Sequence, residues 1–277
     1  MSFSRLIKVS ILVIILAGQG LAQVSVAPTA LFVDSKSKFA TFQVANSSKM
    51  AQEVKVAFVF AYPVSADDGD LTYIYDDEEQ AALHSAADWI RGMPKYFVLD
   101  AGARQTVRLA IKAPGRLAAG TYWARLKVTS TQLSTDVGAA SPNAVSTQIN
   151  FQVNQTFPIY FKHGTTNTGL ELVGLEKNFK SPRKIVFVAD VKKSGNSPYL
   201  GTMHAKIFDA TGEMVGESIV LLSIFYDGKR RIEMDISDLP LGAYTSKIEI
   251  KSGRSDIMAR DIIPGNAVNS SIEFTKL

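Results

Sequence analysis

Apolar and polar residues alternate with a period of two along most of the chain that follows residue 23. This alternation buries one face of a β-strand and leaves the other face in water. Turn-forming pairs such as Thr211-Gly212 and Asp227-Gly228 separate the runs. Many short strands without crossover helices predict an all-β fold of antiparallel sandwiches. The clearest alternating runs are residues 42–44, 54–60, 107–111, 126–128, 185–191, 205–208 and 248–250.

A repeated motif predicts two sandwiches of the same type. Leu117, Gly120 and Tyr122 precede an alternating strand, and Leu, Gly and Tyr recur 122 residues later in residues 239–244, again before a strand. The motif resembles the tyrosine corner of immunoglobulin-like sandwiches, in which a tyrosine bonds back to the preceding loop. A polar stretch at residues 163–169 interrupts the apolar pattern. We therefore expect immunoglobulin-like domains over residues 23–164 and 165–277.

The first of these domains carries a predicted insertion. Residues 78–91 have a helix-like pattern, and we expect a short helix between strands. An acid-rich tract, residues 67–70 and 76–79, lies before this predicted helix and overlaps its first two residues. Its oxygen ligands would suit calcium, but the glycine comes third rather than sixth, so the tract fails the EF-hand spacing. A solvated loop is the favoured interpretation.

The N-terminus has the organisation of a secretory signal peptide. Arg5 and Lys8 precede an apolar run over residues 9–17, and the small residues Gly18, Gly20 and Ala22 follow. This pattern predicts cleavage before Gln23. A retained N-terminal anchor is the alternative, but the run is shorter than the roughly 20 residues that span a bilayer. We therefore expect export to the periplasm, with the cell surface as another destination, and no stable membrane span after cleavage.

Composition removes several classes of function. The 277 residues include no cysteine, which excludes disulfides, thiolate metal sites and cysteine nucleophiles. The formal charge is +4, but residues 1–22 contribute two of the basic residues and no acidic one, which leaves +2. The densest basic cluster, residues 229–231, lies between acidic residues and is predicted to be a solvated turn. The sequence therefore does not predict the concentrated basic face that binding of nucleic acid requires.

The chain also lacks the motifs of common catalytic sites. It contains no nucleophile elbow, zinc-binding His-Glu-x-x-His pair or phosphate-binding loop. The three histidines, His84, His163 and His204, lie in unrelated segments, so no triad or metal site assembles from spacing. Trp89 and Trp123 are expected to be packing residues. We predict a protein that is not an enzyme and that needs no cofactor or metal.

The first domain resembles the PapD-like periplasmic pilus chaperones. The resemblance begins with residues 24–29 and 31–34, which read VSVAPT and LFVD, and continues through residues 42–47, FQVANS. Its most specific part is Met93-Pro94, followed by an apolar strand, Gly102, and residues 105–109, QTVRL. The second domain resembles more general bacterial immunoglobulin-like modules.

This resemblance implies binding of protein subunits by strand donation. A family chaperone lends an edge strand to a subunit whose own sandwich is incomplete. The matching segment here is residues 146–161, in which Gln155 interrupts one apolar phase. An ordinary strand facing its own core is the alternative interpretation. The predicted donor side chains are Ile149, Phe151, Val153, Phe157, Ile159 and Phe161.

One part of the family pattern is missing. Family chaperones grip the subunit's terminal carboxylate with an arginine from the first strand and a lysine from the late edge strand. The first position here matches Thr29-Ala30, which has no arginine, and Lys162 is the nearest lysine to the second. The carboxylate anchor therefore stays unassigned. We expect a periplasmic chaperone-like protein for pilus, fimbrial or other surface subunits; the alternative is an envelope or surface binding module without chaperone activity.

Overall fold

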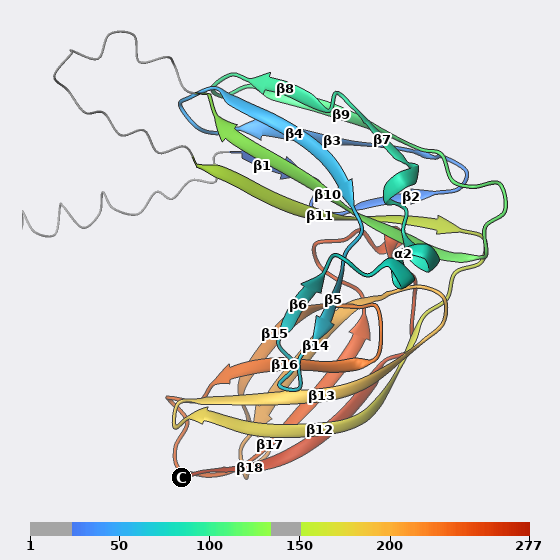
Figure 1. Cartoon of the computed structure of the whole chain (residues 1–277). Coiled ribbons are helices and arrows are strands. Elements are labelled where there is room, and N and C mark those ends of the chain that lie inside the picture. Colours follow the sequence, from blue (N-terminus) through green and yellow to red (C-terminus); the bar gives the residue numbers. More distant parts are fainter. Residues whose placement is uncertain (1–23, 134–150) are drawn as a thin grey trace, which may run out of the picture.

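The computed structural model describes residues 24–133 and 151–277, which form two β-sandwiches joined end to end (Figure 1). The predicted all-β fold is confirmed: both sandwiches are built of paired sheets of immunoglobulin-like type. The predicted signal peptide, residues 1–22, lies outside the described residues. The strands of the N-terminal sandwich end with His163, and those of the C-terminal sandwich begin with Gly169.

The N-terminal sandwich consists of a four-stranded and a five-stranded sheet. All neighbouring strands are antiparallel except β2 and β11, which run parallel. The four-stranded sheet has the order β1 (Val24–Ala27), β3 (Phe39–Asn46), β9 (Arg104–Ile111), β7 (Ile90–Met93). The five-stranded sheet has the order β2 (Leu31–Asp34), β11 (Gln152–His163), β10 (Gly120–Gln132), β4 (Gln52–Val59), β8 (Tyr96–Leu99).

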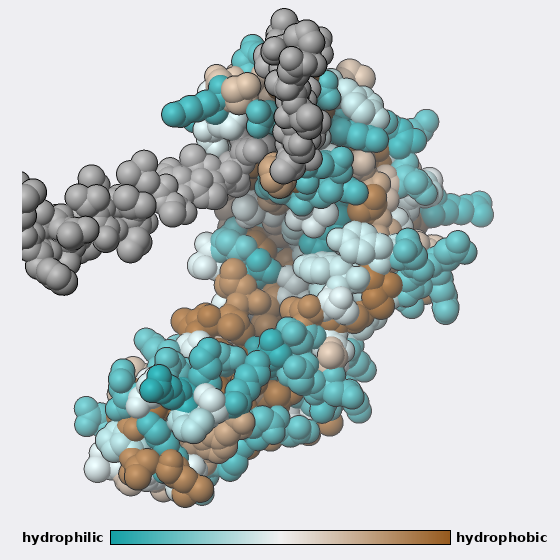
Figure 2. All heavy atoms as spheres, turned by 60° about the vertical axis from the view of Figure 1, so that its left-hand side comes forward, coloured by the Kyte–Doolittle hydropathy of each residue, from teal (hydrophilic) through white to brown (hydrophobic). Residues whose placement is uncertain are grey.

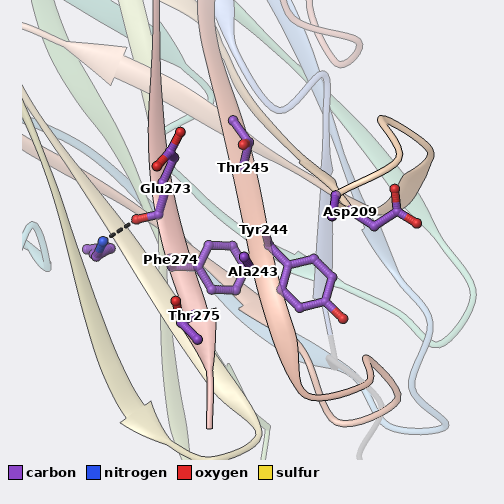
Figure 3. A pocket seen from close by; sticks show the side chains of 9 residues that line it. Asp209, Ala243, Tyr244, Thr245, Glu273, Phe274 and Thr275 are labelled. Atoms are coloured by element: carbon purple, nitrogen blue, oxygen red, sulfur yellow. Dashed lines mark hydrogen bonds between the residues drawn. The ribbon is translucent and has the colours of Figure 1, made fainter.

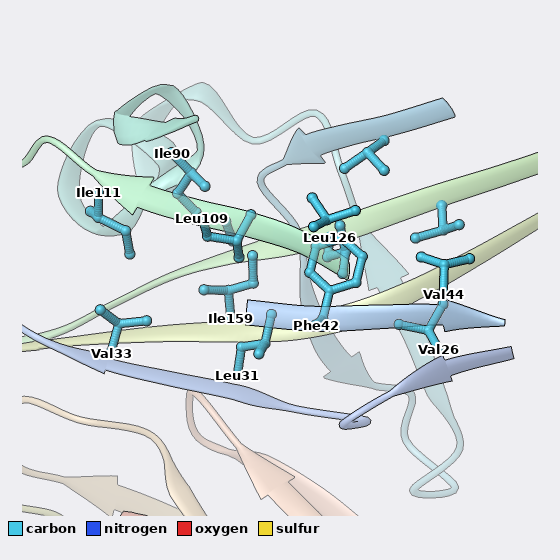
Figure 4. Packing of buried hydrophobic residues seen from close by; sticks show 14 of the residues in the cluster. Val26, Leu31, Val33, Phe42, Val44, Ile90, Leu109, Ile111, Leu126 and Ile159 are labelled. Atoms are coloured by element: carbon cyan, nitrogen blue, oxygen red, sulfur yellow. The ribbon is translucent and has the colours of Figure 1, made fainter. Parts of the chain in front are cut away.

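The core of this sandwich lies between the two sheets, where the inward residues of each strand meet (Figure 4). Phe42, Leu109, Leu126 and Ile159 are almost completely buried there. The period-two pattern of the sequence supplies this core directly, because alternate side chains of a strand point to the same face.

The C-terminal sandwich packs a three-stranded sheet against a four-stranded one. Phe187, Tyr199, Met203 and Ile248 are buried between them. The three-stranded sheet has the order β12 (Gly169–Ser181), β13 (Lys184–Ser194), β16 (Gly228–Asp235). The four-stranded sheet has the order β15 (Met214–Ile224), β14 (Tyr199–Phe208), β17 (Gly242–Ser252), β18 (Val268–Lys276), with the short helix η3 (Ala259–Asp261) before β18.

Both predicted tyrosine corners are confirmed. The Tyr122 hydroxyl donates a hydrogen bond of 3.1 Å to the carbonyl oxygen of Ala118. The Tyr244 hydroxyl donates one of 2.7 Å to the carbonyl oxygen of Pro240. Each bond ties the start of a strand to the loop four residues earlier, so the repeat in the sequence marks the same structural feature in both sandwiches.

The insertion in the N-terminal sandwich is a hairpin followed by a helix. The hairpin pairs β5 (Tyr62–Ser65) with β6 (Leu71–Ile74). The helix α2 (Glu78–His84) is shorter than predicted, and a single turn of 3₁₀ helix, η2 (Ala87–Trp89), follows it. Asp77 caps α2 by accepting a hydrogen bond from the Gln80 amide. The helix ends because Ser85 is extended and Ala86 donates to the Trp123 carbonyl oxygen, so pairing with β10 replaces the next helical turn.

Aromatic packing joins the two sandwiches. Trp123 and Tyr160, on the outer face of the five-stranded sheet, contact Phe225 of the C-terminal sandwich at ring-centre distances of 4.8 and 6.2 Å. The hydroxyls of Thr121 and Ser197 lie 2.7 Å apart at the same junction. The predicted packing role of Trp123 is therefore confirmed, and the partner it packs against is the second sandwich.

The basic cluster at residues 229–231 is not the solvated turn that the sequence suggested. It belongs to β16, where Arg230 is only 2% exposed and burial lowers its pKa to about 10. Arg231 forms ion pairs with Asp68 at 2.8 Å and Asp70 at 2.9 Å. Asp68 and Asp70 of the acidic tract thus pair with Arg231 of the basic cluster across the two sandwiches, a contact between distant segments that local sequence does not reveal.

Candidate functional site

The N-terminal half of β11 is the open edge of the five-stranded sheet. On one side, β11 pairs with β10 along its whole length. On the other side, it pairs with β2 over residues 159–162 only. Residues 152–158 have no partner strand on that side among the described residues. An unpaired strand edge is a template on which another chain can add a strand.

The backbone groups that face this edge follow from strand geometry. The Lys162 carbonyl oxygen accepts a hydrogen bond from the Ser35 amide, so the polar backbone groups of Lys162 point toward β2. These groups alternate sides along a strand. The backbone groups of Gln152, Asn154 and Thr156 therefore point to the open edge. Pro158 also faces that side, where its missing N–H removes no ladder bond to β10.

The predicted donor side chains fall into two groups. Ile159 and Phe161 are 0% and 1% exposed and belong to the sandwich's own core, and Phe157 packs partly against that core. The core alternative is therefore the correct interpretation for the second half of the strand, because these side chains already fill the space between the sheets. Phe151 is 64% exposed and Val153 is half-buried. Ile149 lies outside the described residues.

Gln155 separates these two groups. Its side-chain amide donates a hydrogen bond of 2.7 Å to the carbonyl oxygen of Val24 in β1. The residue that interrupts the apolar phase thus has a structural partner within the chain. Phe151 and Val153 are the described donor candidates that the sandwich core leaves accessible.

Apolar residues gather at the junction of the two sandwiches (Figure 2), and two arginines lie beside them. The Arg125 guanidinium lies over the ring of Tyr73, with its central carbon 4.6 Å from the ring centre. Arg125 is 6% exposed and forms no hydrogen bond or ion pair among the described residues. Burial raises the pKa of Tyr160, while the nearby charges of Arg125 and Arg254 oppose that rise. Two cations therefore lie near this hydroxyl.

Arg254 differs from Arg125 in having its own counter-ion. It binds Asp256 through two hydrogen bonds, of 2.9 and 2.6 Å, and donates a third, of 2.6 Å, to the Ser223 hydroxyl. Burial disfavours its charge, but Asp256 outweighs that effect and the pKa of Arg254 is raised. Arg125, unlike Arg254, consequently has no anionic partner in the described part of the chain.

Lys162, the sequence candidate for a carboxylate anchor, is engaged elsewhere. Its ammonium group donates a hydrogen bond of 2.6 Å to the Asp261 carbonyl oxygen and lies 5.4 Å from the centre of the Phe32 ring. Burial lowers its pKa, and the charges of Asp261 and Asp34 act in the opposite direction. The lysine links the two sandwiches at a place with little free volume.

Arg125 and Arg254 were not identified from the sequence. Arg125 occupies a polar position of an alternating strand, where an ordinary solvated residue is expected, and Arg254 follows a strand in a loop. Arg125 is nevertheless buried, and its guanidinium lies against the ring of Tyr73 from the inserted hairpin. No local pattern carries that information.

Other depressions lie on the surface of the C-terminal sandwich. One on the C-terminal sandwich is lined by Asp209, Tyr244, Glu273 and Phe274, and the Lys177 ammonium donates to the Glu273 carbonyl oxygen beside it (Figure 3). No grouping of acidic and histidine side chains suited to a metal ion occurs over residues 24–133 and 151–277. Within the same residues, no helix has the length and apolarity to cross a membrane.

The chain matches no protein-family model and no curated protein sequence. Solved pilus chaperone structures, however, align with nearly all of it. A structure of the CsuC–CsuE chaperone–tip subunit complex of Acinetobacter baumannii matches at 13% identity and a TM-score of 0.44, covering 91% of this chain and 98% of that chain. The SafA pilin–SafB chaperone complex of Salmonella enterica matches at 12% identity and a TM-score of 0.42, and the match covers 92% of this chain and 97% of that chain.

The CupB2 chaperone of Pseudomonas aeruginosa matches at 13% identity and a TM-score of 0.38, covering 91% of this chain and 100% of that chain. The resemblance to PapD-like pilus chaperones that the sequence suggested is thus found again among solved structures. At these identities and TM-scores the similarity concerns the fold alone, and the function rests on the residues of this chain.

Proposed function

We propose that this protein is a periplasmic chaperone-like factor that holds a pilus, fimbrial or other surface subunit by donating the open edge of β11. The observation that carries the proposal is the unpaired edge over residues 152–158. A subunit with an incomplete sandwich would add a strand there, and the shared ladder of backbone hydrogen bonds would supply most of the affinity. The mechanism involves no chemical catalysis.

The proposed donor set is narrower than the six residues suggested by sequence. Phe151, which directly precedes β11, exposes 64% of its surface to solvent, a large area for an apolar side chain. Val153 lies two residues further along in the same phase. Burying such a pair in a partner's open core contributes about 1.5–3 kcal/mol for each fully buried side chain. Ile149 continues the same phase and belongs to the proposal as well.

The proposed anchor for the subunit's terminal carboxylate is Arg125. Its guanidinium is held in place by Tyr73 and lacks a counter-ion among the described residues. Lys162 is the weaker candidate, because its ammonium group already donates to Asp261. A carboxylate accepts paired hydrogen bonds from a guanidinium, a geometry that a lysine does not offer.

The decisive experiment is co-purification from a bacterial periplasm with candidate surface subunits. Phe151→Asp places a charge in the proposed contact and should abolish capture, while circular dichroism shows an intact fold. Thr156→Pro removes one N–H from the open edge and should weaken capture for a different reason, since it breaks the shared ladder. Asn154→Asp is the matched control, because Asn154 lies on the same strand but in the opposite phase.

Full capture by the folded Phe151→Asp and Thr156→Pro variants would refute strand donation. Failure of the unmodified protein to retain any incomplete subunit would favour the envelope or surface binding module. That alternative predicts binding to a complete, folded partner that the two β11 variants leave unchanged.

A further inference from the structure

The outer face of the four-stranded sheet in the N-terminal sandwich carries positive charge alone. Its outward side chains come from alternate positions of β1, β3, β9 and β7. Arg91, Arg104 and Arg108 are exposed on this face, and none of its outward residues is acidic. The outward residues are Ser25, Ala27, Phe39, Thr41, Gln43, Ala45, Arg91, Met93, Arg104, Thr106, Arg108 and Ala110.

These arginines have no carboxylate partner among the residues that the structure describes. None of the three forms an ion pair in the described part of the chain, which has nine such contacts elsewhere. Arg91 donates only to the backbone carbonyl oxygens of Asp88 and Ile90, at 2.7 and 2.9 Å. No ion pair over residues 24–133 and 151–277 therefore neutralises the positive charge of this face.

Two exposed apolar side chains lie among these charges. Phe39 is 70% exposed and Met93 is 77% exposed. The register places Arg108 directly between Thr41 and Met93, and places Ala110 between Phe39 and Arg91. Directly opposed side chains in a sheet lie about 5 Å apart, and diagonal neighbours about 7–8 Å apart. Phe39, Arg91, Met93 and Arg108 thus form one compact patch.

We propose that this face binds an acidic segment of a partner protein. Arginine, methionine and aromatic side chains are the residues enriched at protein interfaces, and glutamate or aspartate would complement the unpaired guanidiniums. Strand spacing and rise give the face sides of about 15 and 20 Å. The area of a face with these sides is well below the roughly 800 Å² that a stable complex buries on each partner. The face therefore fits a short segment and a transient contact.

Other acidic partners fit this face less well. A nucleic acid calls for a longer basic track than three arginines. A membrane surface calls for apolar side chains that project together into lipid, and here only Phe39 and Met93 do so. Exposed Gln43 and Thr106, between the charges, suit hydrogen bonding to a peptide.

The proposed face is separate from the edge of β11. It lies on the far side of the sandwich core from Trp123 and Tyr160, which contact the second sandwich. A partner on this face would not compete with a subunit held at β11. This inference therefore stands or falls independently of the proposed function.

The test is fluorescence anisotropy of the full mature protein with a labelled acidic peptide, in which pairs of glutamates alternate with single leucines. Arg104→Glu combined with Arg108→Glu should weaken binding at least about tenfold at low salt, and about 0.3 M salt should weaken binding to the unmodified protein. Phe39→Ser combined with Met93→Ser should weaken it several-fold. Lys127→Glu, on the outer face of the other sheet, is the matched control and should leave binding unchanged.

Equal binding by the unmodified protein and the double glutamate variant overturns the proposal. Equal binding of a peptide with lysines in place of the glutamates also overturns it. Binding to phosphatidylglycerol vesicles without binding to the acidic peptide would identify a lipid surface instead and would equally overturn it. Circular dichroism of each variant verifies that these surface substitutions leave the fold intact.

Discussion

The side-chain amide of Gln155 donates a 2.7 Å hydrogen bond to the backbone carbonyl oxygen of Val24. This bond crosses from the five-stranded sheet to the four-stranded sheet at the point where β11 loses its second partner strand. A polar residue in an otherwise apolar phase would usually weaken a strand. Here it secures residues 152–158 of β11, which have no partner strand on the outer side in the described part of the chain.

Gln155→Ala should therefore destabilise the N-terminal sandwich by about 1 kcal/mol, since it leaves a carbonyl oxygen without its donor. Urea unfolding followed by tryptophan fluorescence measures the change. Thr156→Ala is the matched control, because Thr156 is exposed on the opposite face of the same strand, and should change stability by less than about 0.5 kcal/mol. Equal effects of the two variants would show that the Gln155 bond contributes no net stability.

Truncation of Phe161, which lies in β11, should cost much more stability than truncation of Phe151, which precedes that strand. Phe161→Ala removes a ring that is 1% exposed and should cost about 3–5 kcal/mol. Phe151→Ala removes a ring that is 64% exposed and should cost less than about 0.5 kcal/mol. Chemical denaturation of both variants checks the difference. A large loss of stability with Phe151→Ala would mean that its ring packs within the protein and is not available to a partner.

The contrast between these rings also shows what the sequence can predict. The alternation of residues 149–161 predicts a strand and the phase of its apolar side, and the structure has that strand from Gln152 onward. It does not say where along the strand the protein's own core ends, because that depends on where β2 pairs with β11. The two tyrosine corners were predictable because each depends on local sequence alone. In both, the tyrosine bonds to a carbonyl oxygen only four residues earlier in the chain.

Contacts between the two sandwiches were beyond the reach of sequence patterns. Arg231 and Asp68 are 163 residues apart, and each alone looks like part of a solvated charge cluster. Arg125 looks like a solvated strand residue, yet it is 6% exposed and its guanidinium lies over the ring of Tyr73. The helix at residues 78–91 was predicted too long because pairing of Ser85 and Ala86 with Trp123 outweighs local helical propensity.

Arg125 should determine how much a client's free C-terminal carboxylate contributes to binding. For the subunit captured at β11, amidation of the C-terminus should weaken binding to the unmodified protein about tenfold, as expected for loss of a charge-assisted pair. Arg125→Gln should bind both forms equally. Lys162→Gln is the control and should keep the preference for the free carboxylate. An unchanged preference in Arg125→Gln would exclude Arg125 as the anchor, and its loss only in Lys162→Gln would assign the anchor to Lys162.

His84 should make stability depend on pH near neutrality. Its ring stacks on Trp123 at 4.7 Å between ring centres, and burial, aided by the charge of Lys193, lowers its pKa from 6.5. The unfolded chain then takes up the proton before the folded one, so stability is fully present above about pH 6.5 and is lost as pH falls through the lower folded pKa. Urea midpoints between about pH 7.5 and 5 measure this, above the range where most carboxylates titrate.

His84→Phe keeps an aromatic ring against Trp123 but cannot take up a proton. Its urea midpoint should vary less over this pH range than that of the unmodified protein. Parallel pH profiles for the two proteins would show that another group is responsible.

The hairpin of β5 and β6 should help to hold the two sandwiches together. A substitution of Gly69, in the turn of this hairpin, tests that prediction. Gly69 has a φ of +80°, and a Cβ added there would lie 2.9 Å from both the backbone nitrogen and the Cβ of Arg231 in β16. Gly102 has a similar φ of +73° but nothing within 4 Å of an added Cβ. Gly102→Ala therefore measures the backbone cost alone, about 1 kcal/mol. Gly69→Ala should cost about 1–3 kcal/mol more, because backbone atoms of the second sandwich must move.

The additional loss of stability in Gly69→Ala should be accompanied by faster hydrogen exchange at the contact with β16. Backbone strain at the turn alone would not produce that change. Displacing the hairpin stretches the ion pairs of Asp68 and Asp70 with Arg231 and the 2.8 Å hydrogen bond from the Lys229 amide to the Ser65 hydroxyl. Hydrogen exchange should therefore accelerate at residues 65–70 and 228–231 in Gly69→Ala and remain unchanged there in Gly102→Ala. Equal unfolding free energies for the two variants, with no change at residues 228–231, would mean that the hairpin lies beside the second sandwich without holding it.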